Sequence, residues 1–184
     1  MRKTIAIMLG LIISLPGIAD DIYDFSQHIV HGPFSTQIYN NSRVYFSKSQ
    51  DKNHPIYLVM EKNKEPARVV DRYEVSGSDP TIETVFFYRI ENAINIIALV
   101  SWEINSRGIG TYGKLYQVYA YKDKNGELVR NQKIIKNNAM SGLEGYQDFH
   151  DASFKLKTAE EIKKFIQRNF NKTKKTNLQQ NSKS

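Results

Sequence analysis

Three glycines have a spacing that could cradle a phosphate. Gly108, Gly110 and Gly113 form G-x-G-x-x-G within RGIGTYG. In a dinucleotide-binding fold this spacing leads into a helix, whose amino end meets the pyrophosphate. Here it leads into KLYQVYAY, a run typical of a strand, and no V-A-I-K, H-R-D or D-F-G stretch follows to indicate a kinase. The sequence therefore predicts no cofactor site, but a flexible connection between two strands in which glycine permits positive φ.

Other side chains capable of chemistry form no complete site. His28 and His31 could share a helical face and hold a metal ion with Asp24, but no strong ligand cluster completes the site. His150 and Asp151 are neighbours in sequence, whereas catalytic pairs are assembled across a fold. The chain has no cysteine and no G-x-S-x-G stretch, so thiol catalysis is excluded and no serine nucleophile is signalled. The glutamates that could pair in glycoside hydrolysis are scattered without pattern: Glu83, Glu91, Glu103, Glu127 and Glu144. We predict no catalytic residue, no metal site and no enzyme.

The first 19 residues have the pattern of a secretory signal. A basic start, Met1 to Lys3, precedes an apolar run from Ile5 to Leu15 and a small residue, Ala19. The apolar run is well short of the roughly 20 residues of a membrane-spanning helix, which makes an anchor the weaker alternative. We expect cleavage near Ala19 and a periplasmic mature chain that is not inserted in the membrane.

The net charge of +7 is concentrated outside the expected folded body. Of the 26 lysines and arginines, two lie in the signal and four in residues 172–184, which leaves 20 beside all 19 acidic residues in residues 20–171. A nucleic-acid-binding protein usually concentrates positive charge on its folded surface, so we predict no nucleic-acid partner. Residues 172–184 have one leucine as their only large apolar residue. They are predicted to be a disordered basic tail, a solvated terminus rather than an arm for an anionic partner.

Residues 20–171 predict one α+β domain, mainly an antiparallel β-sheet meander with a C-terminal amphipathic helix packed on it. Runs rich in Val, Ile, Tyr and Phe predict strands at 36–40, 43–48, 55–61, 67–75, 81–90, 94–104, 114–122 and 127–135. The run at 94–102 is apolar on both faces, which indicates a central strand. Residues 20–30 fit either a short helix or an extended segment, and the sequence does not decide between them.

Local signals mark two tight turns and one helix. Glu91-Asn92 and Asn125-Gly126 each separate two predicted strands, and the second pair tolerates the positive φ of a tight reversal. Thr158 and Glu161 form a capping box, followed by apolar residues at helical spacing up to Phe170.

Aromatic residues and arginine accumulate around two glycine-containing stretches, NSRGIGTYG and SGLEGYQDF, which we interpret as loops. Tyrosine offers a large contact area with a polar tip, and tyrosine and arginine are enriched at binding hot spots. Some of these aromatic residues are expected to fill the core instead. The predicted partner-binding residues are Arg107, Tyr112, Tyr116, Glu144 and Tyr146.

From Val85 onward, VFFYRIENAINIIALVSWEINSRGIGTYGKLYQVYAYKDKNGELVRNQKII and then GLEGYQDFHDASFKLKTAEEIKKFI resemble small exported proteins of Gram-negative bacteria. Some of those proteins are similar to immunity proteins that neutralise type VI secretion toxins in the periplasm. The resemblance implies a signal sequence, a single β-rich domain and a protein partner, and it carries over no site residue. We therefore expect a protein that inhibits a secreted toxin by steric occlusion, with the oligomeric state left open.

Two alternatives remain open from the sequence. A small-molecule or lipid carrier would need a sizeable apolar pocket. An exported hydrolase would need carboxylates or histidines that converge in a cleft.

Overall fold

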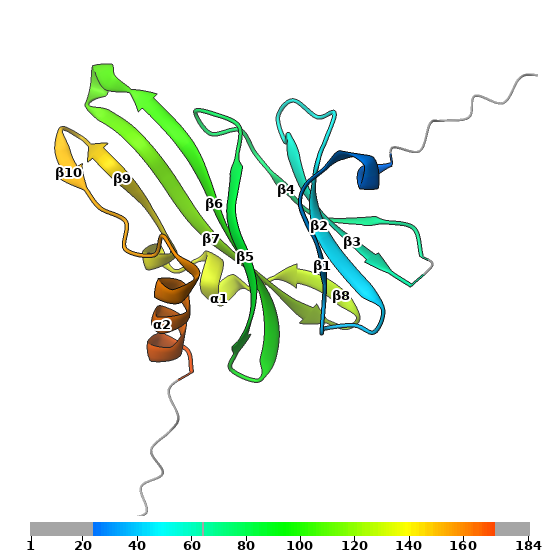
Figure 1. The fold of residues 1–184 in the computed structure, drawn as a ribbon. Coiled ribbons are helices and arrows are strands. Elements are labelled where there is room, and N and C mark those ends of the chain that lie inside the picture. The colour runs from blue at the N-terminus through cyan, green and yellow to red at the C-terminus, as the bar shows by residue number, and fades with distance from the viewer. Residues whose placement is uncertain (1–23, 64, 172–184) are drawn as a thin grey trace, which may run out of the picture.

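The structure is a computed structural model that describes residues 24–63 and 65–171 (Figure 1). The predicted signal, residues 1–19, and the predicted tail, residues 172–184, lie outside the described residues. Within the described ranges, none of the helices has the length and apolar character of a membrane-spanning segment.

The first sheet is an antiparallel meander of four strands in chain order. Its strands are β1 (Ile29–Ser35), β2 (Ser42–Lys48), β3 (Ile56–Lys62) and β4 (Arg68–Tyr73). Of the undecided segment 20–30, the described residues 24–30 contain both forms, because the 3-10 helix η1 (Phe25–His28) leads directly into β1. The predicted strand at 36–40 is wrong. These residues form a turn in which Thr36 Oγ1 accepts a hydrogen bond from the Ile38 amide at 2.9 Å, a local bond that competes with strand pairing.

The second sheet has the strand order β10-β9-β7-β6-β5, and β8 also pairs with β7. Its strands are β5 (Thr81–Ile90), β6 (Ala93–Ser106), β7 (Thr111–Lys124), β8 (Glu127–Arg130), β9 (Ser141–Gln147) and β10 (His150–Ala152). Both predicted tight turns are confirmed, since Glu91 has φ 53° and Asn125 and Gly126 have φ 56° and 87°. One edge of β7 is divided between two partners. Residues 112–117 pair with β9, whereas residues 121–124 pair with β8.

The other helical segments of the described residues are η2 (Arg107–Ile109), α1 (Gln132–Ile135), η3 (Asn138–Met140) and α2 (Ala159–Asn169). The capping box of α2 is confirmed, because Thr158 Oγ1 accepts from the Glu161 amide and Glu161 Oε2 accepts from the Thr158 amide. The predicted strand at 127–135 ends early. Asn131 instead caps α1, accepting from the Lys133 amide at 3.2 Å, while its own amide group donates to Asn95 Oδ1 at 2.9 Å.

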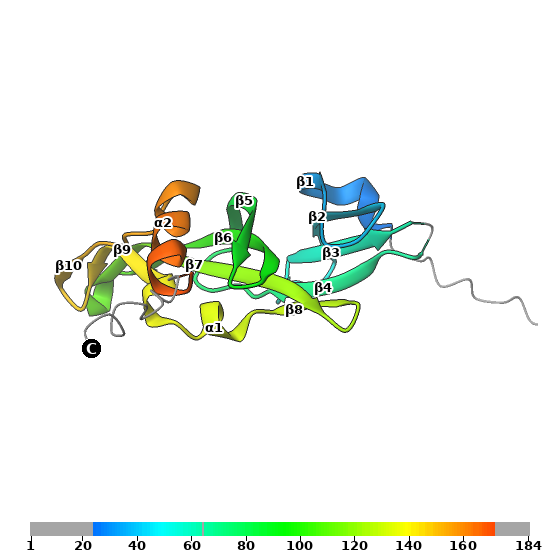
Figure 2. The same cartoon turned by 90° about the horizontal axis from the view of Figure 1, so that it is seen from below.

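Strand β6 is the predicted central strand, and it separates two cores. Ile96, Ala98, Val100 and Trp102 pack with the first sheet. Ile97 and Leu99, on the other face, pack with residues of α1 and α2. Figure 1 shows the first sheet on one side of β5 and α2 on the other, and Figure 2 shows the same elements turned by 90°. The α+β class is confirmed, with two sheets in place of a single one.

Candidate functional site

Two turns that are distant in sequence meet at one end of the second sheet. The first joins β6 to β7 through η2, and the second joins β9 to β10 at Asp148 and Phe149. The Phe149 amide donates to the Gly110 carbonyl at 3.0 Å, and the Asp148 amide donates to Thr111 Oγ1 at 3.2 Å. We call residues 107–112 and 146–151 together the tip.

Gly110 explains why the glycine stretch is needed at the tip. It has φ 68°, and a Cβ at this position would lie 2.5 Å from the Phe149 ring. The expected positive φ is thus found at Gly110 and also at Gly113, whereas Gly108 does not show it. Instead of a flexible connection, η2 forms one turn of 3-10 helix that packs against a second turn.

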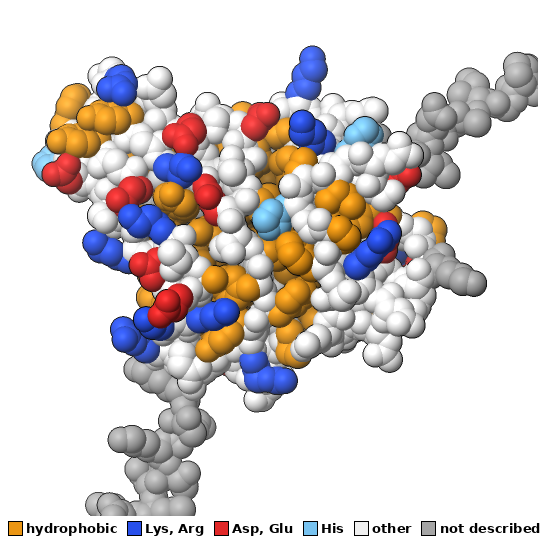
Figure 3. Space-filling model, viewed as in Figure 1, with side chains coloured by type: hydrophobic (Ala, Val, Ile, Leu, Met, Phe, Trp, Pro, Cys, Tyr) orange, Lys and Arg blue, Asp and Glu red, His pale blue; other side chains and the backbone are white. Residues whose placement is uncertain are grey.

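The tip exposes an unusual amount of apolar surface. Ile109 and Phe149 are 66% and 70% exposed, and Tyr146 beside them is 38% exposed. The other large apolar side chains that are exposed within the described part of the chain, Val30 and Val75, lie outside the tip. In Figure 3 hydrophobic side chains gather at the end of the molecule where Figure 1 places the β6–β7 hairpin. Such clustering of exposed apolar side chains is typical of an interaction site.

The backbone holds Phe149 in an unfavourable conformation. Asp148 and Phe149 have φ 52° and 64° in a two-residue turn, where glycine or asparagine is the usual choice. A bulky residue at positive φ costs on the order of 1 kcal/mol or more. Because the ring is 70% exposed, core packing does not account for this choice of residue.

Three of the predicted partner-binding residues form one stack beside the exposed rings. The rings of Tyr112 and Tyr146 are nearly parallel, with centroids 5.2 Å apart and an interplanar angle of 4°. The Arg107 guanidinium lies 4.5 Å from the centre of the Tyr112 ring. The negative charge of Asp151, and a hydrogen bond to it, raise the pKa of Tyr146. These contacts hold the tip side chains in one arrangement.

The other two predicted residues lie on the same sheet face but contact the segment that leads to α2. The ring of Tyr116 stacks on Phe154 at 5.4 Å, and burial raises the pKa of its hydroxyl. Glu144 accepts from the Phe154 amide at 2.9 Å and pairs with Lys157 at 3.0 Å, and its bond to Lys157 is the main cause of its lowered pKa. The predicted loop around Glu144 is in fact strand β9. Both side chains therefore have structural partners within the chain.

A group of paired charges extends from the tip across the same face of the second sheet. We call Glu83, Glu103, Lys114 and Glu144, with Lys157 beside them, the charged strip. Lys114 pairs with Glu83 at 3.2 Å and with Glu103 at 3.6 Å. Burial acts to raise the pKa of Glu83, but the Ser101 hydroxyl and Lys114 outweigh it, so the net effect is a lowered pKa. The tip carries two acidic residues, Asp148 and Asp151, and one basic residue, Arg107. The strip carries three acidic residues and two basic ones: Glu83, Glu103 and Glu144, with Lys114 and Lys157.

The histidines considered as metal ligands do not share a helical face. His28 ends η1, whereas His31 lies on β1 with its ring 5.4 Å from Phe34 and 6.2 Å from Phe46. Asp24 accepts bonds from Ser26 at the start of η1. Within residues 24–63 and 65–171, no group of three or more His, Asp or Glu side chains is placed to hold a metal ion.

Sequence reasoning missed the two most exposed large apolar residues of the tip, Ile109 and Phe149. Each is an isolated apolar residue among glycine and polar neighbours, in RGIG and QDFHD. A large apolar residue within a turn stretch is the signal that could have identified them.

Comparison with protein-family models, with curated proteins and with solved structures finds no match to this chain. The resemblance to immunity proteins therefore stays a prediction, as do the carrier and hydrolase alternatives.

Proposed function

We propose that this chain is an exported protein-binding protein that inhibits a secreted toxin by placing its tip in the toxin's active-site cleft. The observation that supports this most directly is Phe149. This residue is 70% exposed at an end of the molecule, and its backbone has an unfavourable conformation. A residue that costs folding free energy and fills no core is typical of a functional site.

The shape and chemistry of the tip suit a concave partner. Active sites are clefts lined mostly by apolar side chains, and a projecting pair of turns can enter one. Full burial of a phenylalanine or isoleucine side chain contributes about 1.5–3 kcal/mol. Because Phe149 already rests on Gly110, little conformational freedom would be lost on binding. Ile109 and Phe149 are thus suited to be the anchors, with Arg107 and Tyr146 around them.

The charge of the tip and the strip indicates which class of partner would fit them. The excess of acidic residues around the tip favours a toxin whose cleft has a basic rim, because complementary potentials accelerate association and suppress wrong partners. Steric occlusion requires no reacting group on the inhibitor, only a matching surface.

The experiment uses the mature chain, residues 20–184, and the purified product of an adjacent gene as the candidate toxin. Toxin activity and Kd are measured with the unmodified chain and with a Phe149→Ser, Ile109→Ser double variant. We expect the double variant to bind about 100-fold more weakly, which corresponds to the loss of two hot-spot side chains. Val30→Ser is the matched control, since Val30 is 42% exposed on β1, outside the tip. Its affinity should change less than about 2-fold.

Two outcomes would contradict the proposal. If the unmodified chain leaves toxin activity intact, the inhibitory function is wrong. If the chain inhibits but the double variant binds as tightly as the control, the tip is not the binding surface. An Arg107→Ala, Tyr112→Ala variant then tests the stacked side chains separately from the exposed ones.

A further inference from the structure

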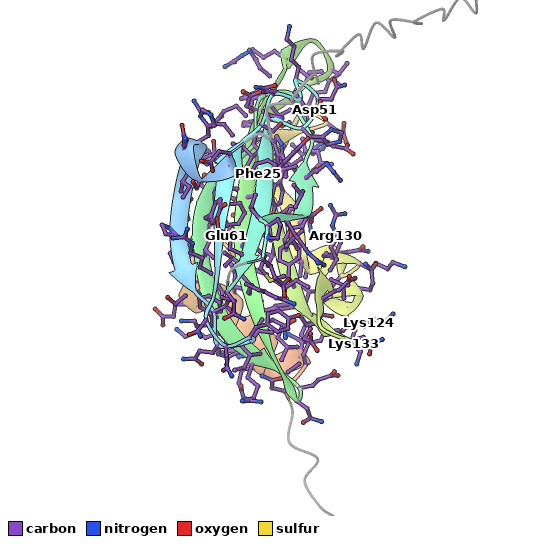
Figure 4. All side chains as sticks on the ribbon, turned by 90° about the vertical axis from the view of Figure 1, so that its right-hand side faces the viewer. Phe25, Asp51, Glu61, Lys124, Arg130 and Lys133 are labelled. Atoms are coloured by element: carbon purple, nitrogen blue, oxygen red, sulfur yellow. The ribbon has the colours of Figure 1, made fainter. Side chains whose placement is uncertain are left out.

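Strand β5 leaves one edge of the second sheet without a strand partner. It ends the order β10-β9-β7-β6-β5, so β6 is its neighbour on one side and no described strand pairs with the other. Figure 4 places Arg130 of β8 and Lys133 of α1 at the border of the molecule opposite to the blue strand β1. Because β8 pairs with β7, on the far side of β6, these elements do not cover the β5 edge. In Figure 2, β5 stands between α2 and β1.

The free edge of β5 is long and lacks most of the features that protect such edges. Natural edge strands are usually short, or carry charged residues, proline or bulges. β5 has ten residues, and its pairing with β6 is irregular only between Ile82 and Thr84. Residues 84–88, TVFFY, contain neither a charge nor a proline, and each is only partly buried. This stretch is therefore the part of the edge that can accept another strand.

Asn171 shows which backbone groups of β5 point outward. Its side chain donates to the Arg89 carbonyl and accepts from the Glu91 amide, both at 2.7 Å. Because backbone groups alternate between the two sides of a strand, those of Val85 and Phe87 point to the same side as the Arg89 carbonyl. No turn or loop of the described residues forms a backbone hydrogen bond with Val85 or Phe87. The edge thus offers free donors and acceptors at these two residues.

We propose that β5 pairs antiparallel with β5 of a second copy of this chain, about a two-fold axis at Phe86, so that the second sheets of two copies become one continuous sheet. In this register Val85 lies opposite Phe87 of the second copy, and the two exchange both of their backbone hydrogen bonds. The register also places Thr84 opposite Tyr88 of the second copy and the two Phe86 rings opposite each other. Aromatic and β-branched pairs of this kind stabilise sheets.

The charges of β5 favour this antiparallel arrangement. Glu83 lies near the start of the strand and Arg89 near its end, so the two-fold axis brings Glu83 alongside Arg89 of the second copy at both ends of the pair. Both bonds that Glu83 accepts, from Ser101 and Lys114, use Oε1, which leaves Oε2 for a further cation. Arg89 is exposed and forms no ion pair with a described residue. A parallel pair in register would align like charges instead. The edge is therefore complementary to itself, which is why a second copy is the occupant.

The dimer leaves both tips accessible. β5 pairs with residues 93–101 of β6, whereas the tip begins at Arg107. Because a strand rises about 3.3 Å per residue, the tip extends roughly 20 Å beyond the paired part of β5. Inhibition by the tip does not require the dimer, so the two proposals are tested separately.

A disulfide test of the register is specific, because the chain contains no cysteine. Directly opposite residues of an antiparallel pair have Cα atoms about 4.5–5.5 Å apart, which is within disulfide range. Phe86→Cys in residues 20–184 should therefore form a covalent dimer on mild oxidation, measured on non-reducing gels. Thr84→Cys is the matched control, because in this register the two copies of residue 84 lie roughly 13 Å apart. We expect it to cross-link at least about 10-fold more slowly.

Sedimentation equilibrium of unmodified residues 20–184 measures the dimer without a cross-link. Arg89→Glu places like charges at both ends of the pair and should raise the Kd of the dimer about 10-fold. Arg68→Glu makes the same charge change at an exposed position on β4, in the first sheet, and should alter the Kd less than about 2-fold. Urea denaturation of each variant shows that it is folded.

Three outcomes would overturn the proposal. One is a chain that stays monomeric up to about 1 mM. Another is equal cross-linking of the two cysteine variants, which would exclude the register about Phe86. The third is a dimer that dissociates when the candidate toxin is added, together with weaker toxin binding by Arg89→Glu, which would assign the β5 edge to the toxin. Because Arg89 lies outside the tip, toxin inhibition by this variant separates failure of the dimer from failure of the proposed function.

Discussion

The two ends of β7 differ in their strand partners and in the side chains that they expose. At the tip, residues 112–117 pair with β9, and the exposed side chains are rings held by stacking and by a strained turn. At the other end, residues 121–124 pair with β8, and the exposed side chains are charged ones of both signs, among them Asp123, Lys124 and Glu127. The tip therefore depends on tertiary contacts between two turns, whereas the opposite end of β7 presents mainly charged side chains in a regular hairpin.

This difference predicts how the two ends respond to change. A surface made by close backbone approach is sensitive to single atoms, because the backbone of Glu144 and Gly145 that lies against Gly113 cannot move aside cheaply. A surface made by solvated charge tolerates such changes but responds to salt. Three substitutions and one change of pH test this difference, and they follow from the largest expected effect to the smallest.

Gly113→Ala should disrupt the tip half of β7. Gly113 has φ 133°, and a Cβ there would overlap the Glu144 carbonyl oxygen on β9. We expect the free energy of unfolding to fall by about 3 kcal/mol, from backbone strain and overpacking together. Urea denaturation measures this. Gly108→Ala is the control, because no atom lies within 4 Å of its added Cβ, and its effect should stay within about 0.5 kcal/mol.

Tyr121→Phe should weaken the half of β7 that pairs with β8. The buried Tyr121 hydroxyl donates to Asp71 at 2.6 Å and shares a 2.6 Å bond with the Tyr73 hydroxyl, and both partners are buried. Loss of this hydroxyl leaves them short of a hydrogen bond, which should cost about 2 kcal/mol in thermal or urea unfolding. Tyr88→Phe, whose hydroxyl bonds Gln167 in an exposed position, should change stability by less than about 0.5 kcal/mol. Similar values for both variants would contradict a special role for the buried pair.

Phe149→Gly should stabilise the fold while it weakens partner binding. Glycine relieves the positive φ of 64°, for an expected gain of about 0.5–1 kcal/mol in the free energy of unfolding. Phe149→Ala removes the same ring but keeps the strained backbone, so it should not stabilise. A gain shared by both variants in calorimetric unfolding would show that the exposed ring, and not the turn, carries the cost.

Acidification should lower the free energy of unfolding slightly, because Glu83 in the charged strip becomes protonated. The Ser101 hydroxyl and Lys114 together outweigh burial and hold the pKa of Glu83 below its ordinary value of 4.5. The unfolded chain has the ordinary pKa, so this contribution is complete above 4.5 and is lost as the pH falls through the lower folded value. Since Glu83 is partly solvated, we expect only about 0.5 kcal/mol. Unfolding measured from pH 6 to 3 should show this step, and Lys114→Met should reduce it.

Strong local signals predicted the parts of the fold in which no distant segment lies directly against the backbone of a glycine. The capping box at Thr158, the turn at Asn125-Gly126 and the apolar run of β6 each depend on residues near one another in sequence. Strand β9 was missed for the opposite reason. Gly142 and Gly145 resemble a loop in sequence, but they are glycines because a Cβ would meet Phe154 in one case and the backbone at Tyr112 in the other.

Some residues of the candidate site could be predicted from the sequence and others could not. Arg107, Tyr112 and Tyr146 were found from composition, since residue types that favour binding are visible in a sequence. Ile109 and Phe149 were not, because whether an apolar side chain is exposed depends on what packs over it. The sequence by itself determined a cysteine-free β-rich chain with a capped terminal helix and a basic C-terminal segment. Only the tertiary structure decided which turns meet at the tip and how β7 is divided between β8 and β9, because contacts between distant segments depend on strand order and register, which local preferences do not encode.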